Sequence, residues 1–468
     1  MKTLHHGINW FFATLGELVS PNSCDLVVLK GKLDRTRLSA AIHKILLRHP
    51  ILCRPLDPLR TAADPLPPLP IDLRFHTLPD EDAARIDEYL LRLIWDEPLA
   101  PGGRPIRFHV VETRERTYLQ TLHTHVYADA TACYALTEQL AAAYAGTAAP
   151  AAPAIASPIG RDDFGKADLL ALLCKSMPLR KQLGGRIKTV AHTPRNLGTP
   201  FAGLATPKHQ TPGRRRLARF VLSASETRRL REAARARGHS IHALFQLAFV
   251  RTAASFNHSR GVERPALRLW DFFSLRPRLG EAGDGYDCLA LIYPVDLSAR
   301  WSDSRVLSRC TRYVEKMRQG ELLVHAQRLD RLAQDFARSP QPFLRMWPAI
   351  FNSNVFFTNP GICPSPLSSF GALEVLDYVT FPQLFSPADL MFVFSTFRDR
   401  LRILATYDED AFGMTFHHAL FEPFLRYLGK LAALDFGTVT TCDGFAASWN
   451  PTPERLLSSP HQTPVHEL

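Results

Sequence analysis

Two proline-rich segments divide the sequence into two comparable halves, and each half alternates strand and helix patterns. The segments are GTAAPAAPAIASPIG at 146–160 and RNLGTPFAGLATPKHQTPG at 195–213, and the second contains three prolines and no helical period. Such segments pack poorly and are typical of surface connections. Strands and helices mixed in both halves predict an α/β (α+β) fold of two lobes. We predict an N-terminal lobe at 1–195, a crossover linker at 196–213, a C-terminal lobe at 214–447 and a loosely held tail at 448–468.

The N-terminal half contains a strand pattern that leads directly into a helix. Residues 24–30 predict a strand, and Asp34 is placed to cap the helix that follows. Residues 106–113 and 117–124 predict a β-hairpin. The second strand of this hairpin runs through HVYAD into a helix rich in alanine and leucine.

The C-terminal half repeats this organisation. Ser223 and Glu226 form a Ser-x-x-Glu capping box before one helix, and Ser240 caps the next. Further strands are predicted at about 266–274, 288–296, 355–358, 391–397 and 401–407, with helices near 303–336 and 414–432 and a helical pattern at 161–190.

Composition limits the class of protein. With 468 residues and 46% hydrophobic content, the chain can bury substantial cores, which excludes global disorder. No stretch reaches the ~18 to 20 uncharged apolar residues of a membrane helix. The start lacks the apolar region of a signal peptide, so we expect a cytoplasmic protein. The eight cysteines lack the close spacing of zinc or redox motifs and are expected to be reduced structural thiols.

The net charge of +11 is mostly dispersed arginine, with one dense run at Arg214, Arg215 and Arg216. A dispersed excess is typical of a solvated surface, and the alternative is an acidic partner. Nucleic acid is disfavoured because the basic residues are not interleaved with aromatics in a recognisable binding module. Both the solvated surface and the acidic partner stay open at this point.

The chemistry is concentrated in LHTHVYADATACYALTEQL, residues 122–140. His125 ends a predicted strand, where an imidazole can face a cleft, and Asp129 stands at the start of a helix. Asp129 can cap that helix or meet a cation, and so hold the turn rigid. A single histidine beside apolar residues is more often structural. Its position at a strand-to-helix turn, after a hairpin, favours an active site.

This segment resembles the HHxxxDG motif of the CoA-dependent acyltransferase superfamily. That group includes the condensation domains of peptide synthetases, the wax ester synthases, the polyketide-associated acyltransferases and the plant BAHD enzymes. The resemblance extends over nearly the whole chain. It also rests on LVVLKGKLDRTRLSAAIHKILLRHPILCRPL at 26–56, SLRPR at 274–278 and FFTNPG at 356–361.

The sequence departs from the family pattern at particular positions. Thr124 stands where the family has its first histidine, and Ala130 where it has glycine, whereas the second histidine is present as His125. The later motifs of assembly-line condensation domains are absent, and residues 284–297 occupy that region. This departure disfavours a role in assembly-line peptide synthesis.

The resemblance implies two chloramphenicol acetyltransferase-like lobes in a V-shaped arrangement with the active-site tunnel between them. His125 is the implied general base, and Asp129 is implied to pair with Arg276 as structural support. The implied co-substrate is acyl-CoA or a phosphopantetheine thioester on an acidic carrier protein, and the acceptor is an alcohol or amine. Backbone N–H groups after Asp129 are candidates for binding the oxyanion. We expect no permanently bound cofactor, and a monomer.

Further residues are candidates for the tunnel wall. They are His123, Thr124, Ala130 and Asn359. His123 lies two residues before His125 on a strand, so both point to one face, and a buried structural role is the alternative. No metal is assigned, because the pair at His417 and His418 lacks visible partners.

Three functions remain open from the sequence. The first is a free-standing O- or N-acyltransferase, the second is a stand-alone condensation enzyme that joins carrier-bound intermediates, and the third is a degenerate member that only binds. His125, Asp129 and Arg276 argue against the third, and the missing condensation motifs argue against the second.

Overall fold

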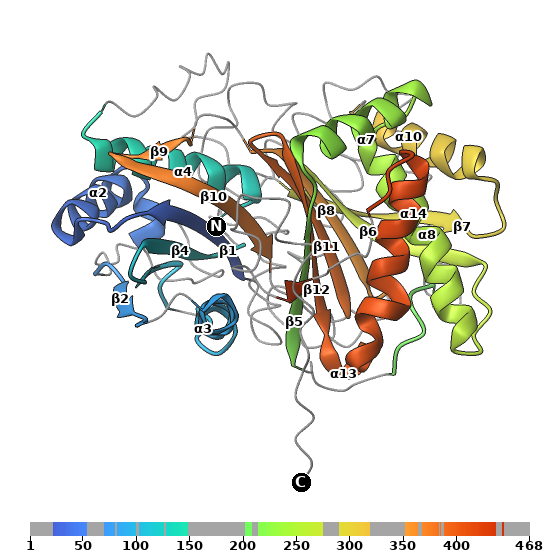
Figure 1. Cartoon of the computed structure of the whole chain (residues 1–468), viewed down its shortest axis with the longest axis horizontal. Helices are drawn as coiled ribbons and strands as arrows, with labels where there is room; N and C mark the ends of the chain where they lie inside the picture. Colours follow the sequence, from blue (N-terminus) through green and yellow to red (C-terminus); the bar gives the residue numbers. More distant parts are fainter. Residues whose placement is uncertain are drawn as a thin grey trace, which may run out of the picture.

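The computed structural model describes residues 22–53, 70–79, 82–99, 103–125, 128–147, 202–207, 214–274, 290–318, 352–363, 367–382, 384, 388–436 and 442–443. Two lobes stand side by side, and each is built on one β-sheet (Figure 1). Within the described residues, no helix has the length and apolar character that crossing a membrane requires.

The first lobe contains the elements of the N-terminal half together with two later strands. In chain order these are β1 (Asn22–Lys30), α2 (Arg35–Arg48), a 3-10 turn (Pro50–Cys53), β2 (Leu73–Thr77), α3 (Ala83–Trp95), β3 (Ile106–Glu112), β4 (Arg116–Thr124), α4 (Ala130–Ala145), β9 (Ser369–Phe370) and β10 (Leu373–Pro382). The second lobe contains β5 (Arg215–Val221), α7 (Ala224–Ala236), α8 (Ile241–Ser259), β6 (Ala266–Ser274), β7 (Ala290–Ser298), α10 (Asp303–Arg318), β8 (Val355–Ile362), β11 (Leu390–Phe397), β12 (Arg400–Asp408), α13 (Glu409–Phe412), α14 (Glu422–Leu431) and β13 (Cys442–Asp443).

The six-stranded sheet has the order β2-β3-β4-β1-β10-β9 and is covered on both faces. Helix α4 packs on one face, where Cys133 contacts His123 of β4. Helix α3 packs on the other, where Gln120 of β4 donates to the carbonyl of Leu90. These contacts follow the two-residue period of β4, because residues 120 and 123 stand on opposite faces of the strand. Coverage on both faces explains why β4 is almost wholly buried.

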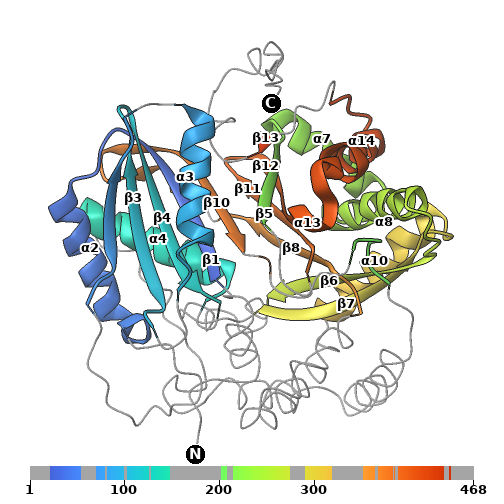
Figure 2. The same ribbon diagram turned by 90° about the horizontal axis from the view of Figure 1, so that it is seen from below.

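The seven-stranded sheet has the order β13-β5-β12-β11-β8-β6-β7. Helices α7, α8, α10 and α14 gather on the face turned away from the first lobe (Figures 1 and 2). On β11, Phe392 and Phe394 pack toward these helices, whereas Met391 and Val393 join the core of the first lobe. The alternation places one apolar face of this sheet against the helices and the other against the neighbouring lobe.

Strand β10 comes from the C-terminal half of the sequence but belongs to the sheet of the first lobe. It pairs antiparallel with β1, with Val27 opposite Tyr378. It also contacts β11 of the second sheet, and Figure 2 shows it between the lobes. The boundaries predicted at 195 and 214 stay a prediction, but sheet pairing assigns 373–382 to the first sheet rather than to the second.

A buried ion cluster joins the two sheets. Asp377 of β10 accepts from Arg219 of β5, with Nη2 and Oδ2 3.0 Å apart, and from Arg402 of β12. All three side chains are at most 4% exposed. Burial lowers the pKa of Arg402 to about 9, and the nearby charge of Arg219 acts in the same direction. The carboxylate belongs to the six-stranded sheet and both guanidinium groups belong to the seven-stranded sheet. The ion cluster therefore holds the two lobes against each other.

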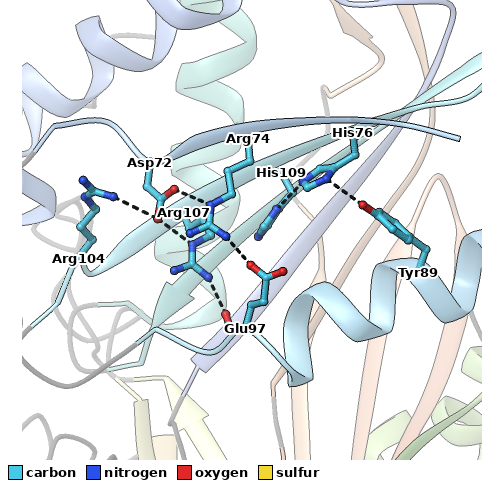
Figure 3. A network of polar contacts seen from close by, with 8 residues as sticks. All are labelled: Asp72, Arg74, His76, Tyr89, Glu97, Arg104, Arg107 and His109. Carbon is cyan, nitrogen blue, oxygen red and sulfur yellow. Dashed lines mark hydrogen bonds and ion pairs between the residues drawn. The ribbon is translucent and has the colours of Figure 1, made fainter.

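A second polar network lies on the outer part of the first lobe (Figure 3). Asp72 accepts from Arg74 Nε at 2.9 Å and Arg107 Nε at 2.8 Å, and Arg104 is 3.5 Å away. Arg74 also pairs with Glu97, beyond the end of α3. The network ties the edge strand β2 to β3 and to α3, which restrains an otherwise open sheet edge.

Two histidines extend this network under α3. His76 Nε2 lies 3.0 Å from His109 Nδ1, and the hydroxyl of Tyr89 lies 2.9 Å from His76 Nδ1 (Figure 3). Burial lowers the pKa of His109 to about 3 and also lowers the pKa of His76. Both rings are therefore neutral at neutral pH and act as hydrogen-bonding groups.

Most elements predicted from local pattern are present. The β3–β4 hairpin, the Asp34 cap of α2 and the Ser223–Glu226 capping box all form. The structure adds β2, α3, β5, β9, β10, α13 and β13, for which no prediction was made. The helix predicted at 303–336 is present as α10 as far as Arg318, and its remainder lies outside the described residues, as does the helical pattern at 161–190.

Candidate active site

His125 follows the last residue of β4 and precedes the first turn of α4. Asp129 caps α4: its backbone is extended (φ −101°, ψ 173°), and its Oδ1 accepts from the N–H of Ala132 at 2.9 Å. An N-cap aspartate satisfies one of the N–H groups that have no carbonyl partner within the helix. Of the two roles open to Asp129 from sequence, helix capping is therefore present.

The hydrogen bond of His125 selects its tautomer. Nδ1 lies 2.9 Å from the carbonyl oxygen of Ala128, and a carbonyl only accepts. In the neutral ring the proton is therefore on Nδ1, and Nε2 carries the lone pair. Burial lowers the pKa of His125, while the Ala128 carbonyl and the charge of Asp129 oppose that shift. The ring is neutral at neutral pH, as a general base requires.

A cavity of about 110 Å³ lies between the lobes and includes His125 in its wall. Its first-lobe side is formed by β1, β10 and the β4–α4 turn, and its second-lobe side by β6, β7, β8 and β11. The lining residues are Ser23, His125, Asp129, Ala130, Thr131, Phe272, Phe273, Ser274, Ala290, Thr358, Asn359, Pro360, Thr380, Met391 and Val393.

The predicted tunnel residues separate into two groups. Ala130 and Asn359 line the cavity together with His125 and Asp129, and they come from opposite lobes. His123 and Thr124 are not among the residues that line it, and both are buried, with at most 1% exposure. Arg276, predicted to pair with Asp129, lies outside the described residues.

His123 belongs to a buried polar cluster that sequence reasoning missed. Its Nε2 lies 2.7 Å from Cys133 Sγ and 3.8 Å from Asp25 Oδ2. The hydroxyl of Thr380 donates to Asp25. Since Ser23 and Thr380 line the cavity, this cluster lies directly behind the cavity wall. Cys133, one of the cysteines expected to be structural, contacts this histidine through its thiol.

The residue types of this cluster are those of metal ligands, so its spacing was compared with that of a zinc site. The candidate ligand atoms of Asp25, His123 and Cys133 lie within 4.8 Å of one another. Two ligands of one tetrahedral zinc, at about 2.3 Å for sulfur and about 2.0 Å for nitrogen, stand about 3.5 Å apart. The sulfur and nitrogen here are closer than that and are in hydrogen-bonding contact. Burial lowers the pKa of His123 to about 3 and raises that of Asp25 to about 7.

The arginine run at 214–216 does not form an unpaired basic patch. Arg216 Nη2 lies 2.9 Å from Glu409 Oε1, and Arg214 Nε lies 4.0 Å from the same carboxylate. Burial lowers the pKa of Arg215, and the charge of Asp408 opposes that shift. These residues belong to or precede β5, so their first role is to join β5 to the start of α13.

Comparison with solved structures identifies the architecture. The epimerization domain of the third module of tyrocidine synthetase B superposes with a TM-score of 0.65 at 16% identity, over 92% of this chain and 96% of that domain. The starter condensation domain of rhizomide synthetase, solved with C8-CoA and Leu-SNAC, gives 0.63 at 14% identity over 94% and 97%. The chain has the two-lobed condensation-domain fold. The predicted fold class is thereby confirmed.

Other comparisons define the limits of this likeness. The nonribosomal peptide synthetase FmoA3 superposes with a TM-score of 0.64 at 17% identity over 93% of this chain, which spans 43% of the synthetase chain. No protein-family model and no curated protein matches the sequence. At these identities the likeness establishes the condensation-domain fold alone.

Proposed function

We propose that the chain is an acyltransferase that moves an acyl group from a thioester to a hydroxyl or amine acceptor. The observation that carries the proposal is the geometry of His125. Its Nδ1–H donates to the Ala128 carbonyl, its Nε2 carries the lone pair, and its side chain forms part of the wall of a cavity between the lobes.

The reaction follows from these positions. His125 Nε2 takes the proton of the acceptor as the acceptor oxygen or nitrogen attacks the thioester carbonyl carbon. The carbonyl oxygen gains negative charge. Ala130 and Thr131, in the first turn of α4, line the cavity, and their backbone N–H groups are the candidate donors that stabilise this charge. Collapse of this intermediate breaks the C–S bond, and the imidazolium returns its proton to the leaving thiolate. No acyl-enzyme is required.

Asp129 contributes by position and by charge. Its carboxylate fixes the first turn of α4, and with it the two N–H groups. Its negative charge stabilises the imidazolium that forms during the reaction, because it raises the pKa of the ring. A pairing with Arg276, which the family resemblance implies, would place a positive charge beside this carboxylate.

The neighbours support thioester substrates for this chain. One of them was solved with C8-CoA and Leu-SNAC. By analogy we propose acyl-CoA or a carrier-bound phosphopantetheine thioester as donor. The net charge of +11 suits an acidic carrier protein as well as the CoA phosphates. Because Arg214 and Arg216 contact Glu409, the carrier surface is not assigned to that run.

The pH dependence of kcat/KM tests the general base. His125 acts only when neutral, and its pKa is lowered from about 6.5. We expect kcat/KM to be constant from pH 8 to about 6.5 and to fall only below that. The charged group that faces the ring from α4 is Asp129, while His123 on β4 stays neutral because its pKa is about 3. Asp129→Asn keeps the helix cap but removes the charge, so it should move the acid limb to lower pH.

The measurement is kcat/KM as a function of pH, at fixed ionic strength, for the wild type and for Asp129→Asn. An acid limb centred above pH 7 in the wild type, or one that Asp129→Asn moves to higher pH, would contradict the assignment of His125 as the base.

A further inference from the structure

A second histidine stands behind the opposite wall of the cavity. His242 lies in the first turn of α8, and its side chain is 11% exposed. Its Nε2 is 2.5 Å from Oδ2 of Asp271 on β6, which is fully buried. Gln246, one helical turn after His242, donates its amide N–H to the same oxygen at 2.7 Å. The carboxylate is thus held by two donors from α8.

This arrangement orients the imidazole. Nε2 of His242 donates to the carboxylate of Asp271, which accepts. Nδ1 lies 3.5 Å from the amide nitrogen of Asn359, and an amide N–H only donates. His242 therefore acts as an acceptor toward the side chain of Asn359.

Asn359 is held at its other end as well. Its Oδ1 accepts from the N–H of Gly361 at 3.0 Å. Gly361 has φ +85°, a conformation that favours glycine. The pairing of β8 with β11 shifts register here, between Thr358 and Gly361, and such bulges re-aim side chains. With the oxygen turned to Gly361 and one N–H to His242, the amide has one N–H remaining.

We propose that His242 and Asp271 are positioning residues that orient the Asn359 amide so that its remaining N–H donates to the reacting thioester carbonyl. Asn359 lines the same cavity as His125, on the facing lobe. The cavity is small, so a carbonyl attacked beside His125 is within reach of the far wall. The donor stabilises the charge that develops on the carbonyl oxygen and forms no covalent bond. This inference rests on the proposed acyl transfer.

A double-mutant cycle tests the relay. With octanoyl-CoA as donor and an acceptor found active with the wild type, Asn359→Ala should lower kcat by ~10² to 10³-fold, as expected for loss of one oxyanion donor. His242→Ala should lower kcat by about tenfold with little change in KM, because it acts through Asn359. In the Asn359→Ala background, His242→Ala should have no further effect on kcat.

Companion variants separate positioning from folding. Asn359→Asp keeps the shape of the side chain and the bond from Gly361 but has no N–H, so it should lose as much kcat as Asn359→Ala. His242→Asn places an oxygen near the position of Nδ1 and should recover part of the loss of His242→Ala. The matched control is His239→Ala, since His239 contacts Thr311 instead of the cavity, and its kcat should equal that of the wild type.

Two results would contradict the positioning role of His242 and Asp271, even if His125→Ala is inactive. One is a double variant whose loss of free energy of activation in kcat is the sum of the losses of Asn359→Ala and His242→Ala. The other is an Asn359→Asp protein with wild-type kcat. If His125→Ala retains full activity, the proposed general-base chemistry fails, and this result is separate from the cycle.

Discussion

Replacing His125 with alanine should lower kcat/KM by at least ~10²-fold while the protein keeps its fold. Proton transfer by a positioned side chain typically contributes ~10² to 10⁴-fold, and the Ala variant lacks the imidazole that takes the acceptor proton. The variant loses the hydrogen bond from Nδ1 to the Ala128 carbonyl. Such a bond contributes about 1 kcal/mol to stability, so the melting temperature should change by only a few degrees.

A matched histidine variant provides the control. His43 lies on the exposed face of α2, so His43→Ala should keep both kcat/KM and the melting temperature of the wild type. Initial rates of thiol release and thermal unfolding would be measured for all three proteins. Near wild-type activity in His125→Ala would remove the catalytic role assigned to this residue.

The largest effect on stability is expected for Asp377→Asn. The substitution preserves shape but removes the carboxylate charge that the buried Arg219 and Arg402 contact. Removing one partner of a buried ion pair costs about 3 to 5 kcal/mol. Because Asp377 joins β10 of one sheet to β5 and β12 of the other, the loss falls on the contact between the lobes. Urea unfolding followed by circular dichroism would measure the change in free energy of unfolding.

An exposed ion pair serves as the comparison. Glu263 pairs with His258 at 2.5 Å, but both side chains are more than three-quarters exposed. Glu263→Gln should therefore change the free energy of unfolding by well under that of Asp377→Asn, since exposed pairs contribute little. Equal effects of the two substitutions would show that the buried cluster does not hold the lobes together.

The local elements around the site could be predicted because their signals are short-range. The β3–β4 hairpin, the start of α4 and its Asp129 cap all lie in one continuous segment, from Ile106 to Ala145. Each follows from the spacing of neighbouring residues in that segment. The position of His125 could be predicted for the same reason, since the strand-to-helix turn depends only on neighbouring residues. Its catalytic role stays a prediction. These signals are local hydrophobic period and capping chemistry.

The remaining features depend on contacts between distant segments. Strand β10 pairs with β1 across more than half of the chain, and no local pattern specifies that partner. The proximity of His242 to Asp271 and Asn359 likewise requires the packing of α8 on the second sheet. His123 was considered for the tunnel because it shares a face with His125. Helix α4 covers that face, and its Cys133 contacts the ring instead.

The most direct test of the central claim is to follow an isotope-labelled acyl group from donor to acceptor. The donors would be acyl groups of several chain lengths, each carried on CoA and on an acyl carrier protein, with alcohol and amine acceptors. Products would be identified by mass spectrometry and free thiol by its release rate, for the wild type and for His125→Ala.

The account predicts a labelled ester or amide, equimolar thiol release that depends on the acceptor, and no labelled protein. It also predicts rates at least ~10²-fold lower in His125→Ala. A kcat/KM about tenfold higher with acyl-CoA than with the same acyl group on the carrier would contradict a carrier protein as donor. The excess of basic residues would then be interpreted as an ordinary solvated surface. No acyl transfer from any donor, or equal product from the wild type and His125→Ala, would contradict the central claim.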